Sequence, residues 1–163
     1  MKRLLLILVA LVVIIPASNT ASAQEQGDFR FGFRTGYYFC TNAYALGVYG
    51  NYGITDWLNI EPGINYICKQ KSSVDVYCDF QVPLEIATYW HLYPIVGVSI
   101  HDISENKGEI DGWAGGLNLG IGSSYNFSGK WGFSAQAKWM GRLPQKHSNA
   151  VIVSVGIDYN FKA

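Results

Sequence analysis

Apolar and polar side chains alternate with a period of two between residues 29 and 161, and turn residues interrupt the alternation at intervals. This period is typical of β-strands, whose successive side chains point to opposite faces. No segment after residue 23 shows helical periodicity over three turns or another long apolar run, which argues against helical membrane spans. The pattern predicts eight strands: Phe29–Tyr38, Tyr44–Ile54, Leu58–Cys68, Tyr77–Trp90, Leu92–His101, Trp113–Phe127, Trp131–Gly141 and Val151–Phe161.

One alternating set in every predicted strand is apolar and carries no charge. The other set holds the charged residues and eleven of the glycines, against three glycines on the apolar set. In a soluble barrel the charged set would face water, where glycine has no reason to concentrate. In a narrow membrane barrel lipid meets the apolar set, and the crowded lumen takes polar and small residues. The sequence therefore predicts an all-β fold, an eight-stranded antiparallel up-and-down transmembrane β-barrel, rather than a soluble ligand-binding barrel.

The charged residues of the inward set predict a network inside the barrel. Eight strands leave an interior only just wide enough for side chains. Unpaired buried charges are costly, so these groups should pair with one another and plug the lumen. A small or gated pore is the alternative. The predicted network consists of Arg30, Arg34, Glu61, Asp79, Glu85, Lys138 and Asp158.

Large aromatic residues gather at the ends of the predicted strands. Membrane barrels carry such residues as girdles at both membrane interfaces, whereas a β-sandwich core is the alternative explanation. One predicted girdle consists of Tyr37, Tyr38, Tyr44, Tyr66, Trp113 and Trp139. The other consists of Tyr52, Trp57, Trp90, Phe127, Trp131, Tyr159 and Phe161.

The lengths of the connections predict the orientation, because outer-membrane barrels have short periplasmic turns and longer outer loops. Three alternate connections are short: Thr55–Trp57, the single residue His91, and Ser128–Lys130. The other four, around residues 39–43, 69–76, 102–112 and 142–150, are longer. Both chain termini are therefore expected in the periplasm.

The first 23 residues have the layout of a cleaved secretory signal peptide. Two basic residues precede an apolar run from Leu4 to Ile15, and small residues follow up to Ala23. The run of twelve is shorter than the roughly 20 residues of a membrane helix. Residues 24–163 are then the barrel domain. Their net charge is about −2 once Lys2 and Arg3 are removed, so no basic excess suggests nucleic acid as a partner.

Three segments of the chain resemble the small outer-membrane β-barrel proteins. Gly53–Ile64 is similar to their first strand-turn-strand, Val82–Ile86 to their fourth strand, and Val155–Phe161 to their last strand. The family is the OmpA/OmpX-like type, within the outer membrane protein beta-barrel domain and porin-like families. The resemblance covers the whole mature chain. It implies contact with outer-membrane lipid and recognition of the last strand, with its terminal aromatic, by the barrel-insertion machinery.

Cys40, Cys68 and Cys78 are all expected near the outer end, in a compartment where disulfides persist. Cys68 and Cys78 lie on neighbouring predicted strands on either side of one loop, and both belong to the same alternating set, so their side chains point to the same face. A bridge between them is therefore the favoured pairing. Cys40 is then the odd thiol, and it could instead pair with either cysteine or with another chain. No histidine lies at ligand spacing from the cysteines, so no metal site is predicted.

Catalysis is the least favoured function class. Some eight-stranded barrels modify lipid A with a histidine, a serine and an acid near the outer rim, and triads of this kind require spatial convergence. No cofactor motif is present. The leading hypothesis is a non-enzymatic barrel with a structural or surface-interacting role and an unknown loop ligand, and a narrow solute channel is the alternative. The candidate rim clusters are His101-Asp102 with Ser99, Ser104 and Glu105, and His147-Ser148.

Overall fold

The computed structural model describes residues 26–68, 73–102, 114–143 and 149–161, except for the side chains of Arg142 and Leu143. The signal peptide predicted over residues 1–23 lies outside these ranges. The described residues form nine antiparallel strands. These are β1 (Phe29–Tyr38), β2 (Ala43–Thr55), β3 (Leu58–Cys68), β4 (Ser73–Gln81), β5 (Leu84–Ala87), β6 (Trp90–Asp102), β7 (Ala114–Asn126), β8 (Trp131–Leu143) and β9 (Ala150–Asn160).

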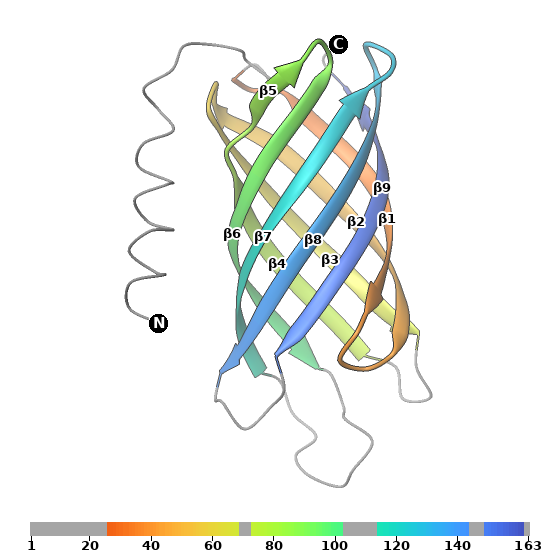
Figure 1. Cartoon of the computed structure of the whole chain (residues 1–163). Coiled ribbons are helices and arrows are strands. Elements are labelled where there is room, and N and C mark those ends of the chain that lie inside the picture. The colour runs from red at the N-terminus through yellow and green to blue at the C-terminus, as the bar shows by residue number, and fades with distance from the viewer. Residues whose placement is uncertain (1–25, 69–72, 103–113, 144–148, 162–163) are drawn as a thin grey trace, which may run out of the picture.

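The strands close into a barrel (Figure 1). The first and last strands pair from Arg30 opposite Asn160 to Tyr38 opposite Ile152, and β4 pairs with β6 on the other side. Eight strands form the wall, and β5 is an extra strand that pairs only with β6. The predicted eight-stranded antiparallel barrel is confirmed. The start of β1 and the end of β9 lie at one end, which we call the termini end, and the other end is the loop end.

The fourth predicted strand, Tyr77–Trp90, is wrong as a single element. The strand is interrupted at Val82 and Pro83, where proline has no N–H for the ladder. The chain then forms the short strand β5 and reverses direction at Thr88 and Tyr89. The φ angle of Tyr89 is +66°. The predicted one-residue turn at His91 is therefore also wrong. His91 is the second residue of β6, and its side chain is buried.

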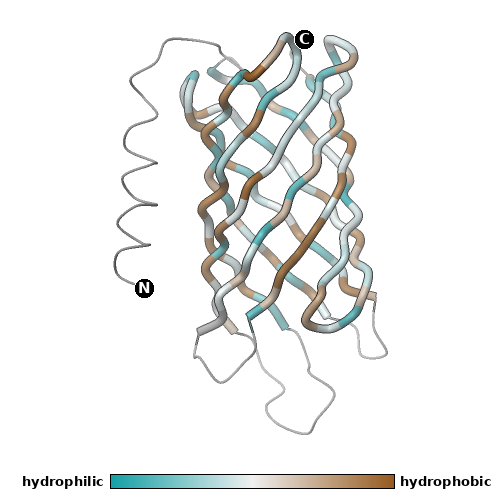
Figure 2. The backbone as a smooth tube through the Cα atoms, viewed as in Figure 1, coloured by the Kyte–Doolittle hydropathy of each residue, from teal (hydrophilic) through white to brown (hydrophobic). Residues whose placement is uncertain are grey.

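The polarity of the barrel is inverted relative to a soluble protein. The outward side chains are apolar and exposed, as in Phe33 (61%) and Leu46 (60%), whereas the inward side chains are mostly polar and buried. Figure 2 shows hydrophobic and hydrophilic positions alternating along the strands. Within the described part of the chain, no helix is long and apolar enough to cross a membrane. The buried polar side chains therefore gather in the lumen, which is the candidate functional site.

Candidate functional site

A buried ion pair occupies the middle of the lumen. The guanidinium of Arg34 on β1 donates two hydrogen bonds to Glu61 on β3, with N–O distances of 2.6 and 3.2 Å. This fork geometry gives the strongest form of a charged hydrogen bond. The Arg34 guanidinium also donates to the Tyr77 hydroxyl at 2.8 Å, and it lies 3.9 Å from the centroid of the Tyr49 ring. Gln136 on β8 donates further hydrogen bonds to the Glu61 carboxylate.

A second ion pair lies beside the first. Lys138 Nζ on β8 is 2.8 Å from Asp79 Oδ2 on β4, and the Asp79 side chain is 0% exposed. Asn118 Nδ2 donates to the other carboxylate oxygen at 2.9 Å. Lys138 Nζ lies 3.9 Å from the centroid of the Tyr77 ring, whose hydroxyl accepts from Arg34. Tyr77 thus joins the two ion pairs into one layer across the barrel.

A third acidic group lies closer to the termini end. Asp158 on β9 accepts a hydrogen bond from the Tyr49 hydroxyl at 3.1 Å, and Arg30 Nη1 lies 3.7 Å from its other oxygen. Arg30 also donates to Asn126 Oδ1 at 2.8 Å. Tyr49 and Ser134 share a further hydrogen bond of 3.1 Å. These contacts connect the last strand to β1, β2 and β8.

Six of the seven residues predicted for the lumen network thus lie inside the barrel, and Glu85 does not. Glu85 belongs to β5 and is exposed, because β5 pairs only with β6 and lies past the end of the β3–β4 ladder. Sequence reasoning missed three buried tyrosines that complete the network. Their signal is an inward aromatic residue beside an inward glycine on the neighbouring strand. The pairs are Tyr49 with Gly32, Tyr77 with Gly63, and Tyr93 with Gly122.

An apolar cluster from β1, β2, β3, β8 and β9 packs in the lumen at the loop end, beside the buried Asp75 and His101. Its seven side chains are all nearly inaccessible to solvent. Tyr38, which was expected in an outer girdle, is one of them at 1% exposure, and its hydroxyl donates to Asp75 Oδ2 at 2.6 Å. The cluster consists of Tyr38, Ala43, Ala45, Ile67, Met140, Ala150 and Ile152.

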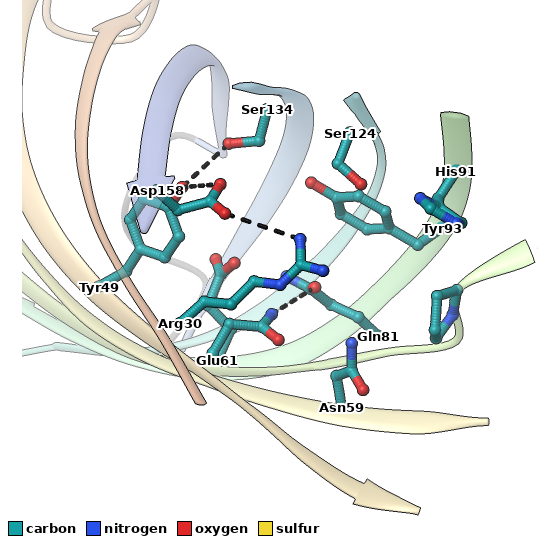
Figure 3. A pocket seen from close by; sticks show the side chains of 12 residues that line it. Arg30, Tyr49, Asn59, Glu61, Gln81, His91, Tyr93, Ser124, Ser134 and Asp158 are labelled. Atoms are coloured by element: carbon teal, nitrogen blue, oxygen red, sulfur yellow. Dashed lines mark hydrogen bonds and ion pairs between the residues drawn. The ribbon is translucent and has the colours of Figure 1, made fainter. Parts of the chain in front are cut away.

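A small polar cavity lies in the lumen at the termini end (Figure 3). It has a volume of about 40 Å³, which is room for a few water molecules. Figure 3 shows Asp158 and Arg30 pointing toward one another across it. We call this cavity the vestibule. Its lining residues are Arg30, Tyr49, Asn51, Asn59, Glu61, Gln81, Pro83, His91, Tyr93, Ser124, Ser134 and Asp158.

Residues 7–161 match the family described as "Outer membrane protein beta-barrel domain". The chain belongs to this family. Its place is therefore the bacterial outer membrane, with lipid around the wall. No curated protein sequence is significantly similar to the chain.

Solved structures of outer-membrane proteins share the fold. The N-terminal β-barrel domain of OprF from Pseudomonas aeruginosa matches with a TM-score of 0.71 at 16% identity, over 85% of this chain and 100% of that domain. Neisserial surface protein A matches with a TM-score of 0.62 at 13% identity, over 82% and 96% of the two chains. Ail, the attachment invasion locus protein of Yersinia pestis, matches with a TM-score of 0.55 at 12% identity, over 83% and 99%.

Two of the candidate rim residues face the lumen rather than the outer surface. His101 and Ser99 are buried on the inward face of β6, and Ser99 donates to Asn118 Oδ1 at 3.1 Å. Ser104, Glu105, His147 and Ser148 lie outside the described residues. Within the described ranges, no group of three or more histidine, cysteine, aspartate or glutamate side chains could hold a metal ion.

The predicted disulfide between Cys68 and Cys78 is wrong. Strand β4 begins at Ser73, opposite Ile67, so Cys78 lies opposite Pro62 and six residues along the ladder from Cys68. At about 3.3 Å per residue this separation is roughly 20 Å, whereas a disulfide needs Cα atoms within about 7 Å. Neither cysteine forms a disulfide in the described chain. The error came from placing the start of β4 four residues too late.

The aromatic residues of the predicted girdles, Tyr38 and Trp113 apart, lie on the outer wall near its two ends. At the loop end Tyr37 packs against Tyr44 with ring centroids 5.2 Å apart, and Tyr66 and Trp139 are exposed nearby. At the termini end Tyr159 packs against Trp131 at 5.1 Å and against Phe161 at 5.3 Å. Trp57 and Trp90 are exposed at the same end. Trp113 lies outside the described residues.

Proposed function

We propose that this protein is a closed outer-membrane barrel with a structural or surface-interacting role, and that its lumen does not conduct solutes. The observation that carries the proposal is the sequence of layers along the lumen. The apolar cluster packs at the loop end, and the layer of two ion pairs with Tyr77 fills the middle. The vestibule of about 40 Å³ is the space left at the termini end. A sugar or an amino acid would have to displace buried ion pairs to pass.

The proposal includes an orientation with the termini end in the periplasm. The turns at the termini end are short, whereas the strand ends that border the longer connections, from β3 to β4, from β6 to β7 and from β8 to β9, lie at the loop end. Longer connections belong on the outer side in barrels of this kind. The exposed aromatics near both ends would then lie at the two membrane interfaces. Phe161 follows directly after β9 and is 63% exposed. It would be the terminal aromatic residue that the insertion machinery recognises.

We propose that any surface interaction takes place at the loops. The wall outside is an apolar surface for lipid and the lumen is filled, which leaves the loop end as the surface that a molecule outside the cell could contact. Two proteins of similar fold are named as a surface protein and an attachment invasion locus protein. Their names support a surface-interacting role for the loops of this chain.

Conductance in planar lipid bilayers tests the closed barrel. Purified, folded protein is expected to give no stable conductance steps, because the ion-pair layer and the apolar cluster block the path. Heat-modifiable migration on gels serves as the control that the inserted protein is a folded barrel. Large, stable steps from the unaltered chain would contradict the proposal and favour a narrow channel for small solutes.

A further inference from the structure

The vestibule walls carry two buried acceptor oxygens without a hydrogen-bond donor among the described residues. One is Asn51 Oδ1, on an asparagine whose amide nitrogen donates to Gln81 Oε1 at 2.9 Å. The other is Asp158 Oδ1, whose nearest cation is Arg30 Nη1 at 3.7 Å. Both residues are more than nine-tenths buried and line the same cavity. A buried acceptor without a donor destabilises the folded protein, so a donor that enters the cavity is favoured there.

The vestibule lies at the termini end of the lumen, and the ion-pair layer closes it toward the loop end. Its lining residues come from the termini ends of the strands: Arg30 is the second residue of β1, and Asn59 is the second of β3. Toward the loop end the ion-pair layer comes first, with Arg34, Glu61 and Lys138 all nearly inaccessible. The apolar cluster lies beyond that layer.

The chemistry of the walls defines the ligand. Two acceptors require a molecule with at least two N–H or O–H donors, and about 40 Å³ admits only a very small one. We propose that the vestibule is a binding site for small hydrogen-bond donors that bridge Asn51 and Asp158 and enter from the termini end only. Water and the ammonium ion share this chemistry. The site goes beyond the closed-barrel proposal, because a closed barrel could equally well be dry throughout.

Contacts between solvent protons and side-chain amides test the ligand. In lipid nanodiscs, magnetisation transfer from water is expected to reach the amide protons of Asn51 and Gln81. The amide of Asn65 is the matched control, because it is buried at the other side of the ion-pair layer and bonded to Tyr38 and Asp75. A second sample with ¹⁵N-labelled ammonium identifies that ion if it is the donor. Contact from either source supports the site, and absence of both at Asn51 and Gln81 overturns it.

Sided labelling tests the direction of entry. In a chain carrying Cys40→Ser, Cys68→Ser and Cys78→Ser, the added change Ser124→Cys places a thiol in the vestibule. Ser128→Cys marks the termini end, and Asn149→Cys marks the loop end, since both positions are exposed.

A small, charged, membrane-impermeant thiol reagent is then added to one side of sealed proteoliposomes. The Ser124→Cys thiol is expected to react only from the side on which Ser128→Cys reacts. Reaction from the Asn149→Cys side, or no reaction where Ser128→Cys reacts, overturns one-sided entry. The conductance of the unaltered chain is a separate measurement, so the closed barrel and the vestibule can fail independently.

Discussion

Replacing Glu61 by glutamine is expected to lower the free energy of unfolding by about 3–5 kcal/mol, the range for removing one partner of a buried ion pair. The variant keeps the size of the side chain and removes its charge. Arg34 then has no carboxylate partner at Glu61 in a lumen where it is almost fully buried, and its two hydrogen bonds to that side chain weaken. Denaturant unfolding in detergent or lipid, followed by heat-modifiable migration, measures the change.

Glu85→Gln is the matched control for this prediction. The same chemical change at an exposed position of β5 is expected to stay within about 0.5 kcal/mol of the unaltered chain. The double variant Glu61→Gln with Arg34→Met removes the orphaned charge and should recover much of the loss, because an apolar replacement of a buried pair is often neutral. Equal, small effects of Glu61→Gln and Glu85→Gln would show that the Arg34–Glu61 pair does not stabilise the barrel.

Replacing Gly63 by alanine is expected to destabilise the barrel by about 1–3 kcal/mol, the range for overpacking a filled interior. A Cβ at this position would collide with the Tyr77 ring. The ring cannot move freely, because its hydroxyl accepts from Arg34 and its face lies against Lys138 Nζ. A single methyl group therefore disturbs both ion pairs. Unfolding in denaturant checks the prediction.

Gly115→Ala is the control for the alanine change, since no atom lies within 4 Å of a Cβ there. Alanine at this strand position should be neutral or stabilise by up to about 0.5–1 kcal/mol. In a chain that already carries Tyr77→Ala, Gly63→Ala should cost nothing further, because the ring is gone. If Gly63→Ala is as harmless as Gly115→Ala in the unaltered chain, the close packing of Gly63 and Tyr77 is not rigid.

The wall of the barrel could be predicted from sequence because its signal is local. Strand β3 was placed with both ends correct, since each inward residue is followed by an outward one and the period identifies the element. The inverted polarity followed from which alternating set held charge and glycine. Such patterns reflect only the direction of each side chain relative to its neighbours, and they need no knowledge of distant contacts.

The departures from the prediction arise where strands begin and end. A proline and a residue with positive φ, Pro83 and Tyr89, divide the predicted fourth strand. The period of two continues across that break, so it could not show that Glu85 lies past the end of the β3–β4 ladder, where it is exposed. The separation of Cys78 from Cys68 has a different origin, the earlier start of β4 at Ser73. Proline marked the break in the sequence, but the direction taken by β5 depends on its pairing with β6.

The contents of the lumen were only partly predictable, because they depend on which strands face one another across the interior. The position of the charged residues on the inward set predicted that they lie inside the barrel. Which residue pairs with which depends on the register between neighbouring strands. The apolar cluster had a weaker signal: Ile67, Met140 and Ile152 are apolar residues on the polar set near strand ends. Read alone, each looks like an exception to the pattern, and only the closed barrel brings them together.

The closure of β1 against β9 has a consequence for the kinetics of folding. The hydrogen bond between Tyr49 and Asp158 joins residues 109 positions apart, and it can form only once the last strand reaches the first. Folding slows as the contacts it needs lie farther apart along the chain. Before closure, the charged groups would stand at an open edge in contact with lipid, where ionised side chains are poorly tolerated. Partly closed intermediates should therefore be scarcely populated, and assembly of the barrel in the membrane should be slow and all-or-none.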